Sequence, residues 1–249
     1  MTEEMTRYYP RFSRDGDYDK LINFYEGHPH QSILKRNAPL IKKMIDEGTV
    51  IMLENKDGDI IAASVTYPYA AKNAAGNDNV KWQEVGTLRS AVGGFGLVDA
   101  LVSLQTLRTF LVEPPSDRFI ARMDDAPVQK MGKRLGFREF APVKEVFNLK
   151  AAMVPEDAHA PKHENWYQLG IEGMPVVAQA AAKLLDNPVL QNKRTGEKIM
   201  LDFSRSNFCR RFGEEIRALA AADLGDIEKP DMSKGIRREQ KNLIAHFYH

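Results

Sequence analysis

A glycine-rich stretch, Ala91-Val92-Gly93-Gly94-Phe95-Gly96-Leu97, decides the fold. The residues before it, Lys81 to Val92, are typical of a strand, and Leu97 to Leu107 form an apolar-rich pattern typical of a buried helix. A glycine loop between a strand and a helix frees several backbone N–H groups at the positive end of the helix dipole. We therefore expect a site for an anionic group such as a pyrophosphate at Gly93 to Gly96.

The glycines of this loop are weak evidence when they are taken alone. They lack both the full dinucleotide-binding fingerprint and the lysine of a phosphate-binding P-loop. The alternative interpretation is a loop whose glycines only permit a tight turn and close packing. The elements on either side of the loop therefore have to be considered with it.

The segments before the loop predict one strand, two helices and a hairpin. Tyr8 to Ser13 indicates a strand, and Asp17 is expected to cap a helix that ends near Gly27. A second helix should end at Gly48. Alternating segments around Asp57-Gly58 then indicate two strands joined by a tight turn.

The segments after the loop predict a shorter alternation and then an extension. The expected elements are a strand at 118–123, a helix at 126–135, a strand at 137–149, a helix at 175–185, a strand at 198–203 and a helix at about 206–222. We interpret 1–153 as a first domain, 154–165 as a linker and 166–249 as a helix-rich extension. The extension is too short for an independent core, so we expect it to dock on the first domain or on a dimer mate.

Composition places the chain among ordinary globular proteins. It has 249 residues, 43% of them hydrophobic, and a net charge of +1 from 35 basic and 34 acidic side chains. This balance offers no general attraction to nucleic acid or to an anionic membrane. No apolar run is long enough to span a bilayer, and the single cysteine excludes an internal disulfide. We expect a cytoplasmic protein without nucleic-acid or membrane partners.

The order of elements over residues 7 to 150, together with the glycine loop, resembles the GNAT superfamily of acyl-CoA-dependent N-acyltransferases. The family loop has the pattern Gln/Arg-x-x-Gly-x-Gly/Ala, and this chain supplies Gly94 and Gly96 but has Ala91 at the first position. The family helix that ends in Gly-Phe is matched by Gly136-Phe137. The resemblance implies an α/β (α+β) fold with a mixed, mostly antiparallel sheet flanked by helices.

The resemblance also implies a function. It predicts acyl transfer, acetyl in the first place, from acetyl-CoA to the primary amine of a small molecule or peptide, by direct transfer in a ternary complex. The cofactor-binding residues would be Ala91, Val92, Gly93, Gly94, Phe95, Gly96 and Leu97. Two alternatives stay open: a GNAT-fold binding or assembly protein that has lost turnover, and a homodimer whose extension completes the neighbouring cleft.

Two positions that the family uses around the reacting groups are changed in this chain. The usual asparagine and tyrosine of the family are replaced by Asp125 and Gly132, and that tyrosine often protonates the departing thiolate. Glu84 stands on the strand before the loop, where several family members place a carboxylate base, and it is our candidate catalytic residue. Tyr67 and Tyr69 are possible acids. The alternatives are an exposed strand glutamate and tyrosines that serve only in packing.

Other chemically active residue types have simpler interpretations. His28 and His30 have no acidic partner at metal-ligand spacing, so we expect a solvated loop there and no metal. Asp124-Asp125 is expected to cap a helix. Cys209 lies in the extension, outside the motif, which argues against a covalent relay through it.

Overall fold

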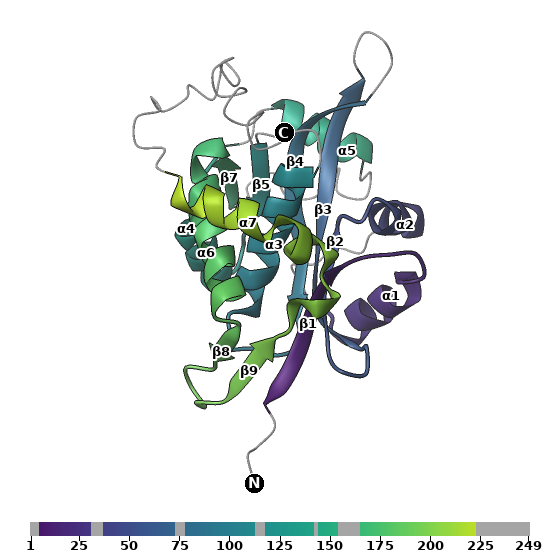
Figure 1. The fold of residues 1–249 in the computed structure, drawn as a ribbon. Coiled ribbons are helices and arrows are strands. Elements are labelled where there is room, and N and C mark those ends of the chain that lie inside the picture. Colours follow the sequence, from purple (N-terminus) through teal and green to yellow (C-terminus); the bar gives the residue numbers. More distant parts are fainter. Residues whose placement is uncertain are drawn as a thin grey trace.

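The computed structural model describes residues 5–30, 37–72, 78–112, 118–141, 144–153 and 165–222. Within these residues nine strands form one sheet in the order β6-β7-β5-β4-β3-β2-β1-β9-β8 (Figure 1). The strands are β1 Thr6–Phe12, β2 Val50–Glu54, β3 Ile60–Lys72, β4 Asp78–Ser90, β5 Arg118–Arg122, β6 Arg138–Glu139, β7 Trp166–Gly170, β8 Val189–Gln191 and β9 Lys198–Leu201.

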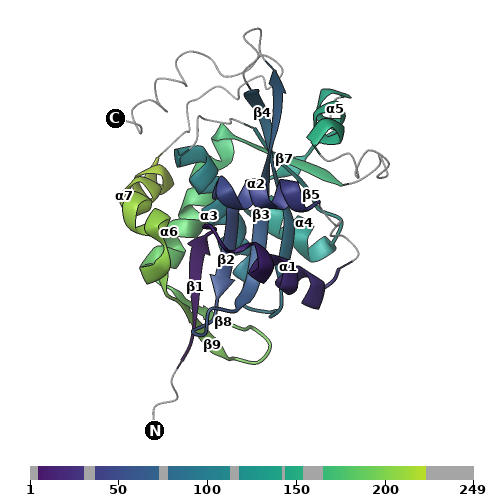
Figure 2. The ribbon, with the colours of Figure 1, turned by 90° about the vertical axis from the view of Figure 1, so that its right-hand side faces the viewer.

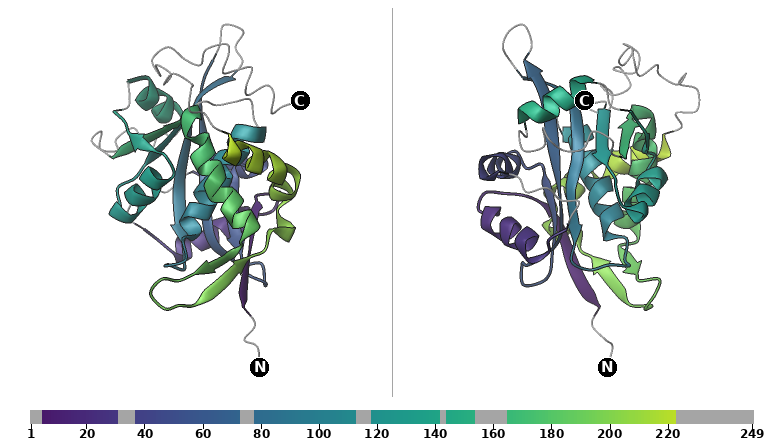
Figure 3. Two further views of the ribbon diagram at one scale, coloured as in Figure 1. Left: turned by 60° about the vertical axis from the view of Figure 1, so that its left-hand side comes forward. Right: turned by 180° about the vertical axis from the view of Figure 1, so that it is seen from behind.

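Helices cover both faces of the sheet. The α-helices are α1 Tyr18–Gly27, α2 Ala38–Asp46, α3 Leu97–Val112, α4 Ala126–Arg134, α5 Lys144–Met153, α6 Met174–Asp186 and α7 Asn207–Ala221. Helices α1, α2 and α5 lie on one face, and α3, α4, α6 and α7 lie on the other (Figures 1 and 3). The predicted fold class, a mixed and mostly antiparallel sheet flanked by helices, is confirmed. Among the described residues, no helix combines the length and apolar character that a membrane span needs.

Helix α3 is the centre of the larger core. Most of its sixteen residues are buried, because β2, β3 and β4 lie on one side of it and α6 and α7 on the other. A helix enclosed in this way shows little amphipathic periodicity, which is why its sequence is apolar all round. The glycine loop thereby leads into a helix that is buried along most of its described length.

The segment after α4 corrects one expectation. The strand predicted at 137–149 is wrong: β6 covers only Arg138–Glu139, and Lys144–Met153 form α5. Phe147 and Leu149 pack against the smaller core on the face of α1 and α2, so the apolar residues there serve a helix rather than a strand. Residues 154–164 of the expected linker lie outside the described residues.

The C-terminal part of the chain contributes strands to the same sheet. β7 is antiparallel to both β5 and β6 and lies between them. From the sequence we assign β5 and β6 to the first domain, 1–153, and β7 to the extension, 166–249. β9 pairs in parallel with β1, and β8 pairs with β9 at that edge. In Figure 2 the strands β8 and β9 lie near the lower end of β1, and α6 and α7 lie above them.

Candidate functional site

A β-bulge interrupts β4 just before the glycine loop. The register to β3 passes from Ala63 opposite Arg89 to Val65 opposite Gly86, so β4 carries one extra residue there. Within the bulge Thr87 has a φ of 48°, in the left-handed region that a β-branched residue rarely adopts. The surrounding contacts must therefore hold this conformation.

Two tyrosines on the α1 face hold the bulge. The Tyr25 hydroxyl donates to the Thr87 carbonyl oxygen at 2.6 Å, and the Tyr67 hydroxyl lies 2.7 Å from Thr87 Oγ1. Burial is the main cause that raises the pKa of Tyr25 well above its usual value, and the neighbouring Tyr67 adds to it. Tyr25 is therefore a neutral donor throughout the physiological range.

The bulge coincides with a separation of β4 from β5. These parallel strands pair only at Gln83 with Phe119 and at Glu84 with Ile120, although β4 continues to Ser90 and β5 to Arg122. A cavity of about 290 Å³ opens where the pairing stops. The β4 backbone from Val85 onward forms one wall of this cavity.

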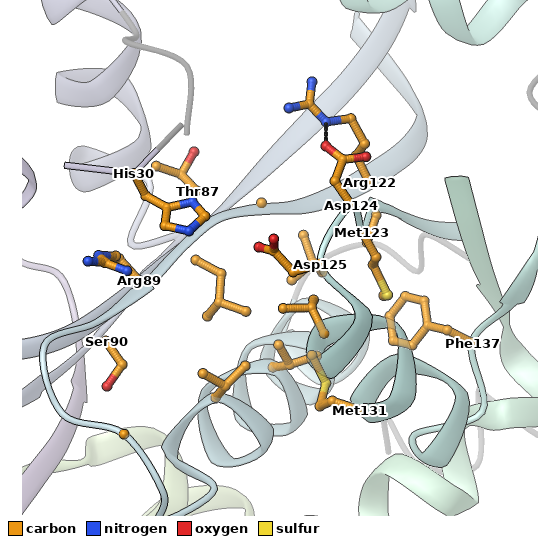
Figure 4. A pocket seen from close by; sticks show the side chains of 18 of the residues that line it. His30, Thr87, Arg89, Ser90, Arg122, Met123, Asp124, Asp125, Met131 and Phe137 are labelled. Carbon is orange, nitrogen blue, oxygen red and sulfur yellow. Dashed lines mark ion pairs between the residues drawn. The ribbon is translucent and has the colours of Figure 1, made fainter. Parts of the chain in front are cut away.

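The cavity has an apolar floor and a polar rim (Figure 4). Apolar side chains come from α3, α4 and the residues next to them: Val98, Val102, Val128, Met131 and Phe137. Polar side chains are carried by the loop after α1, by β4 and by the end of β5: His30, Thr87, Arg89, Ser90, Arg122, Asp124 and Asp125. A pocket of this kind can hold an apolar arm below and a charged or reacting group at its mouth.

The glycine loop borders this cavity. Val92 and Gly93 line it, and the loop leads directly into α3. Gly94 and Gly96 have φ values of 90° and 75°, which glycine adopts without steric cost. Among the described residues, the backbone N–H groups of residues 93 to 97 show no acceptor in the protein. Leu97 begins α3, and the N–H groups of a first helical turn have no partner within their helix.

Glu84, our candidate base, does not line the cavity. Its side chain is 5% exposed and lies on the face of the sheet that α5 covers. Tyr69 donates its hydroxyl proton to Oε2, and Lys150 Nζ of α5 lies 3.4 Å from Oε1. Of the two candidate acids, Tyr69 is therefore hydrogen-bonded to Glu84, whereas Tyr67 is hydrogen-bonded to Thr87 in the bulge.

His30 and Asp125 reach the cavity, which the sequence did not predict. His30 was expected in a solvated loop, but its imidazole lies at the mouth of the cavity near Thr87 (Figure 4). Asp125 stands at the N-cap of α4, yet its side chain makes no capping hydrogen bond, so the expectation that it caps the helix is wrong. The carboxylate of Asp125 points into the cavity (Figure 4). The neighbouring Asp124 instead forms an ion pair with Arg122 at 3.0 Å.

Gly132 has a packing reason that the sequence did not show. A Cβ at this position would collide with Sδ and Cε of Met123, which follows β5 and lines the cavity. Methionine sulfur therefore occupies the space next to the position where the resembling family carries tyrosine. Among the described residues, no cluster of histidine, cysteine or acidic side chains could hold a metal ion.

Comparisons with known proteins give structural likenesses only. No protein-family model and no curated protein sequence matches the chain. Similar solved structures include Rv2747 from Mycobacterium tuberculosis in complex with CoA (16% identity, 65% of this chain, 98% of that chain, TM-score 0.49). A second is the Drosophila melanogaster polyamine N-acetyltransferase (13% identity, 66% of this chain, 100% of that chain, TM-score 0.46). A third is the loading GNATL domain of CurA from Lyngbya majuscula (12% identity, 66% of this chain, 98% of that chain, TM-score 0.49). Each of these likenesses covers about two thirds of this chain.

Proposed function

We propose that the protein is an acyl-CoA-dependent N-acyltransferase that transfers an acyl group, acetyl in the first place, to a primary amine. The observation that carries this proposal is the cavity between the separated strands β4 and β5, which ends at the glycine loop and the N-terminus of α3. The two features together provide an anion-binding end and an apolar channel in one continuous site. The fold resemblance stated from the sequence supports the same activity.

Backbone groups can hold the cosubstrate. The N–H groups of residues 93 to 97 and the positive end of the α3 dipole suit the pyrophosphate of CoA. The unpaired wall of β4 can hydrogen-bond the amide-rich arm of acyl-CoA, and the valines of α3 and α4 can cover it. Because these donors belong to the backbone, Ala91 in place of the family glutamine or arginine removes none of them.

Direct transfer needs few catalytic groups. The neutral amine nitrogen attacks the thioester carbonyl carbon, the C–S bond breaks, and the sulfur leaves as a thiolate that takes up a proton. The amine loses a proton to a base in the same sequence. Holding the two reactants in line in the cavity supplies much of the rate, and backbone N–H groups stabilise the developing oxyanion.

We retain Glu84 as the proposed base, and the structure adds His30 as a second group to be tested. Glu84 would act on the face of the sheet between α1 and α5, where it contacts Tyr69 and Lys150. His30 lines the cavity itself, and histidine is the side chain that most often serves as a general acid or base. The carboxylate of Asp125 at the same rim would attract an acceptor that arrives as an ammonium ion and loses a proton to the base before it attacks.

Cosubstrate binding and turnover test the proposal in two stages. Calorimetry with CoA should show one site per chain, and acetyl-CoA with a panel of small primary amines and amine-bearing peptides should release free thiol. Absence of CoA binding would overturn the proposal. Binding without turnover of any acceptor would instead favour the alternative of a GNAT-fold binding or assembly protein.

Matched variants identify the base. If Glu84 is the base, Glu84→Gln should lower turnover by about 10² to 10⁴-fold. Because this change also breaks a buried ion pair, the control is Glu54→Gln, which breaks the buried pair with Arg11 far from the cavity. The control should lose stability and keep turnover. Full turnover of Glu84→Gln together with a large loss in His30→Gln would assign the role to His30.

A further inference from the structure

The extension reaches the glycine loop through the turn between β8 and β9. Asn192, the first residue of this turn, is 9% exposed, and its Nδ2 donates to the Gly93 carbonyl oxygen at 3.3 Å. The residue is distant in sequence from the loop. This contact joins the extension to the site through a polar side chain, which apolar docking of α6 and α7 alone would not require.

Asn192 itself is held in place by its own turn. Its Oδ1 accepts from the backbone N–H of Arg194 at 3.0 Å and lies 3.4 Å from that of Thr195. Its backbone N–H donates to Glu197 at 2.8 Å, and its carbonyl oxygen accepts from Gly196 at 2.8 Å. The carboxamide therefore has one orientation, with the oxygen toward the turn and the nitrogen toward the glycine loop.

The fit between Asn192 and the loop depends on glycine at position 94. A Cβ added to Gly94 would lie 2.6 to 2.7 Å from the three outer atoms of the Asn192 carboxamide, closer than real side chains approach. The carboxamide thus lies directly against the Gly94 backbone. The sequence pattern predicted glycine here for the ligand, and the structure shows that the extension needs it as well.

The hydrogen bond to Gly93 controls the orientation of a loop amide. In a planar trans peptide the carbonyl and the N–H of the next residue point in opposite directions. Asn192 draws the Gly93 carbonyl toward the β8–β9 turn, so the Gly94 N–H must point away from that turn. It is thereby prepared to donate to a ligand without reorganisation.

We propose that Asn192 is a positioning residue for the CoA moiety of the cosubstrate and that it acts by presetting the Gly94 amide. This inference rests on the proposed function. It gives the extension a part in cosubstrate binding, because the extension completes the site in its own chain. The expected signature is a change in the binding of acyl-CoA with little change in the rate at saturation.

The variant Asn192→Asp tests the inference most directly. Aspartate keeps the acceptor for the N–H groups of Arg194 and Thr195 but cannot donate to Gly93. Asn192→Ala removes both. We expect the Kd for CoA and the KM for acetyl-CoA to rise about three- to tenfold in both variants, with kcat and the KM for the amine within twofold of wild type. Gln191→Ala, an exposed neighbour on β8, is the control and should bind CoA as wild type does.

Hydrogen exchange of the wild-type protein provides a readout that needs no variant. Added CoA should slow exchange of the amides of residues 192 to 197, because a fixed loop in turn fixes the hairpin. Wild-type affinity in a folded Asn192→Asp, or unchanged exchange in the hairpin when CoA is bound, would overturn the inference and leave the proposed function standing. Failure of wild type to bind CoA would overturn both.

Discussion

The three glycines of the loop differ in whether a side chain at that position would strain the backbone. A Cβ at Gly93 meets nothing within 4 Å, and its backbone is outside the left-handed region, whereas Gly94 and Gly96 have positive φ and Gly94 also contacts Asn192. A loss of binding in a Gly94 or Gly96 variant could therefore come from strain rather than from the ligand. Gly93 is the position that separates the two causes.

We predict that Gly93→Glu lowers CoA affinity at least about tenfold, because its carboxylate would oppose a pyrophosphate at the loop amides. Thermal stability should stay close to that of wild type. Calorimetry and a melting curve check this, with Gly27→Glu at the end of α1 as the control, since its Cβ also meets nothing. Unchanged CoA affinity in Gly93→Glu would exclude the glycine loop as the pyrophosphate site.

Cys209 is predicted to be chemically inert near neutral pH. Its side chain is 6% exposed in α7, away from the cavity, and burial raises the pKa of the thiol to about 11. The native protein should not react with a thiol reagent at pH 7.5 but should react after denaturation. Rapid native labelling would reopen the possibility of a covalent relay.

The same thiol predicts an alkaline decrease in stability. The pKa of the Cys209 thiol is higher in the folded state than its usual value of 9.0. The stability that the folded protein gains from the neutral thiol is therefore fully present below pH 9 and is lost as the pH rises toward 11. The loss is at most about 3 kcal/mol. Denaturant titrations from pH 8 to 11 should show a steeper fall for wild type than for Cys209→Ala, and parallel curves would contradict the prediction.

At the scale of an element, the shape of β4 depends on two hydroxyl groups. Tyr25→Phe removes the donor to the Thr87 carbonyl, whose strained bulge forms the wall of the cavity. We expect a loss of about 1 to 3 kcal/mol in unfolding free energy and a lower kcat/KM, since the wall then has more than one arrangement. Tyr18→Phe on the same helix is the control, and equal effects in both variants would refute the role of the Tyr25 hydroxyl.

Local patterns predicted most elements but not how the site is assembled. The glycine loop, the hairpin β2–β3 and the helices α3 and α4 follow from local periodicity and turn residues. The helix α5 was missed because its short apolar run has no clear period and follows a strand signal at Phe137. Local patterns also cannot show that His30, Asp125 and Asn192 approach one site, because tertiary packing of distant segments brings them there.

At the scale of the whole molecule, we predict one cooperative unit. A fragment of residues 1–155 lacks β7, which lies between β5 and β6, and it lacks β9 and the helices that cover α3. Neither this fragment nor 160–249 should show a cooperative melting transition, and the full chain should melt in one step. Circular dichroism checks this, and two fragments that fold independently would contradict it. A homodimer stays a prediction to be checked by solution mass.

The parallel pairing of β1 with β9 has a consequence for biosynthesis. The first strand of the chain obtains its outer neighbour only when nearly all the described residues have been translated, and β5 likewise waits for β7. The emerging polypeptide therefore carries two open strand edges while it is still attached to the ribosome. Its native structure can form only after β7 and β9 emerge, so a chain that stops before Lys198 should yield aggregated material that depends on chaperones for solubility.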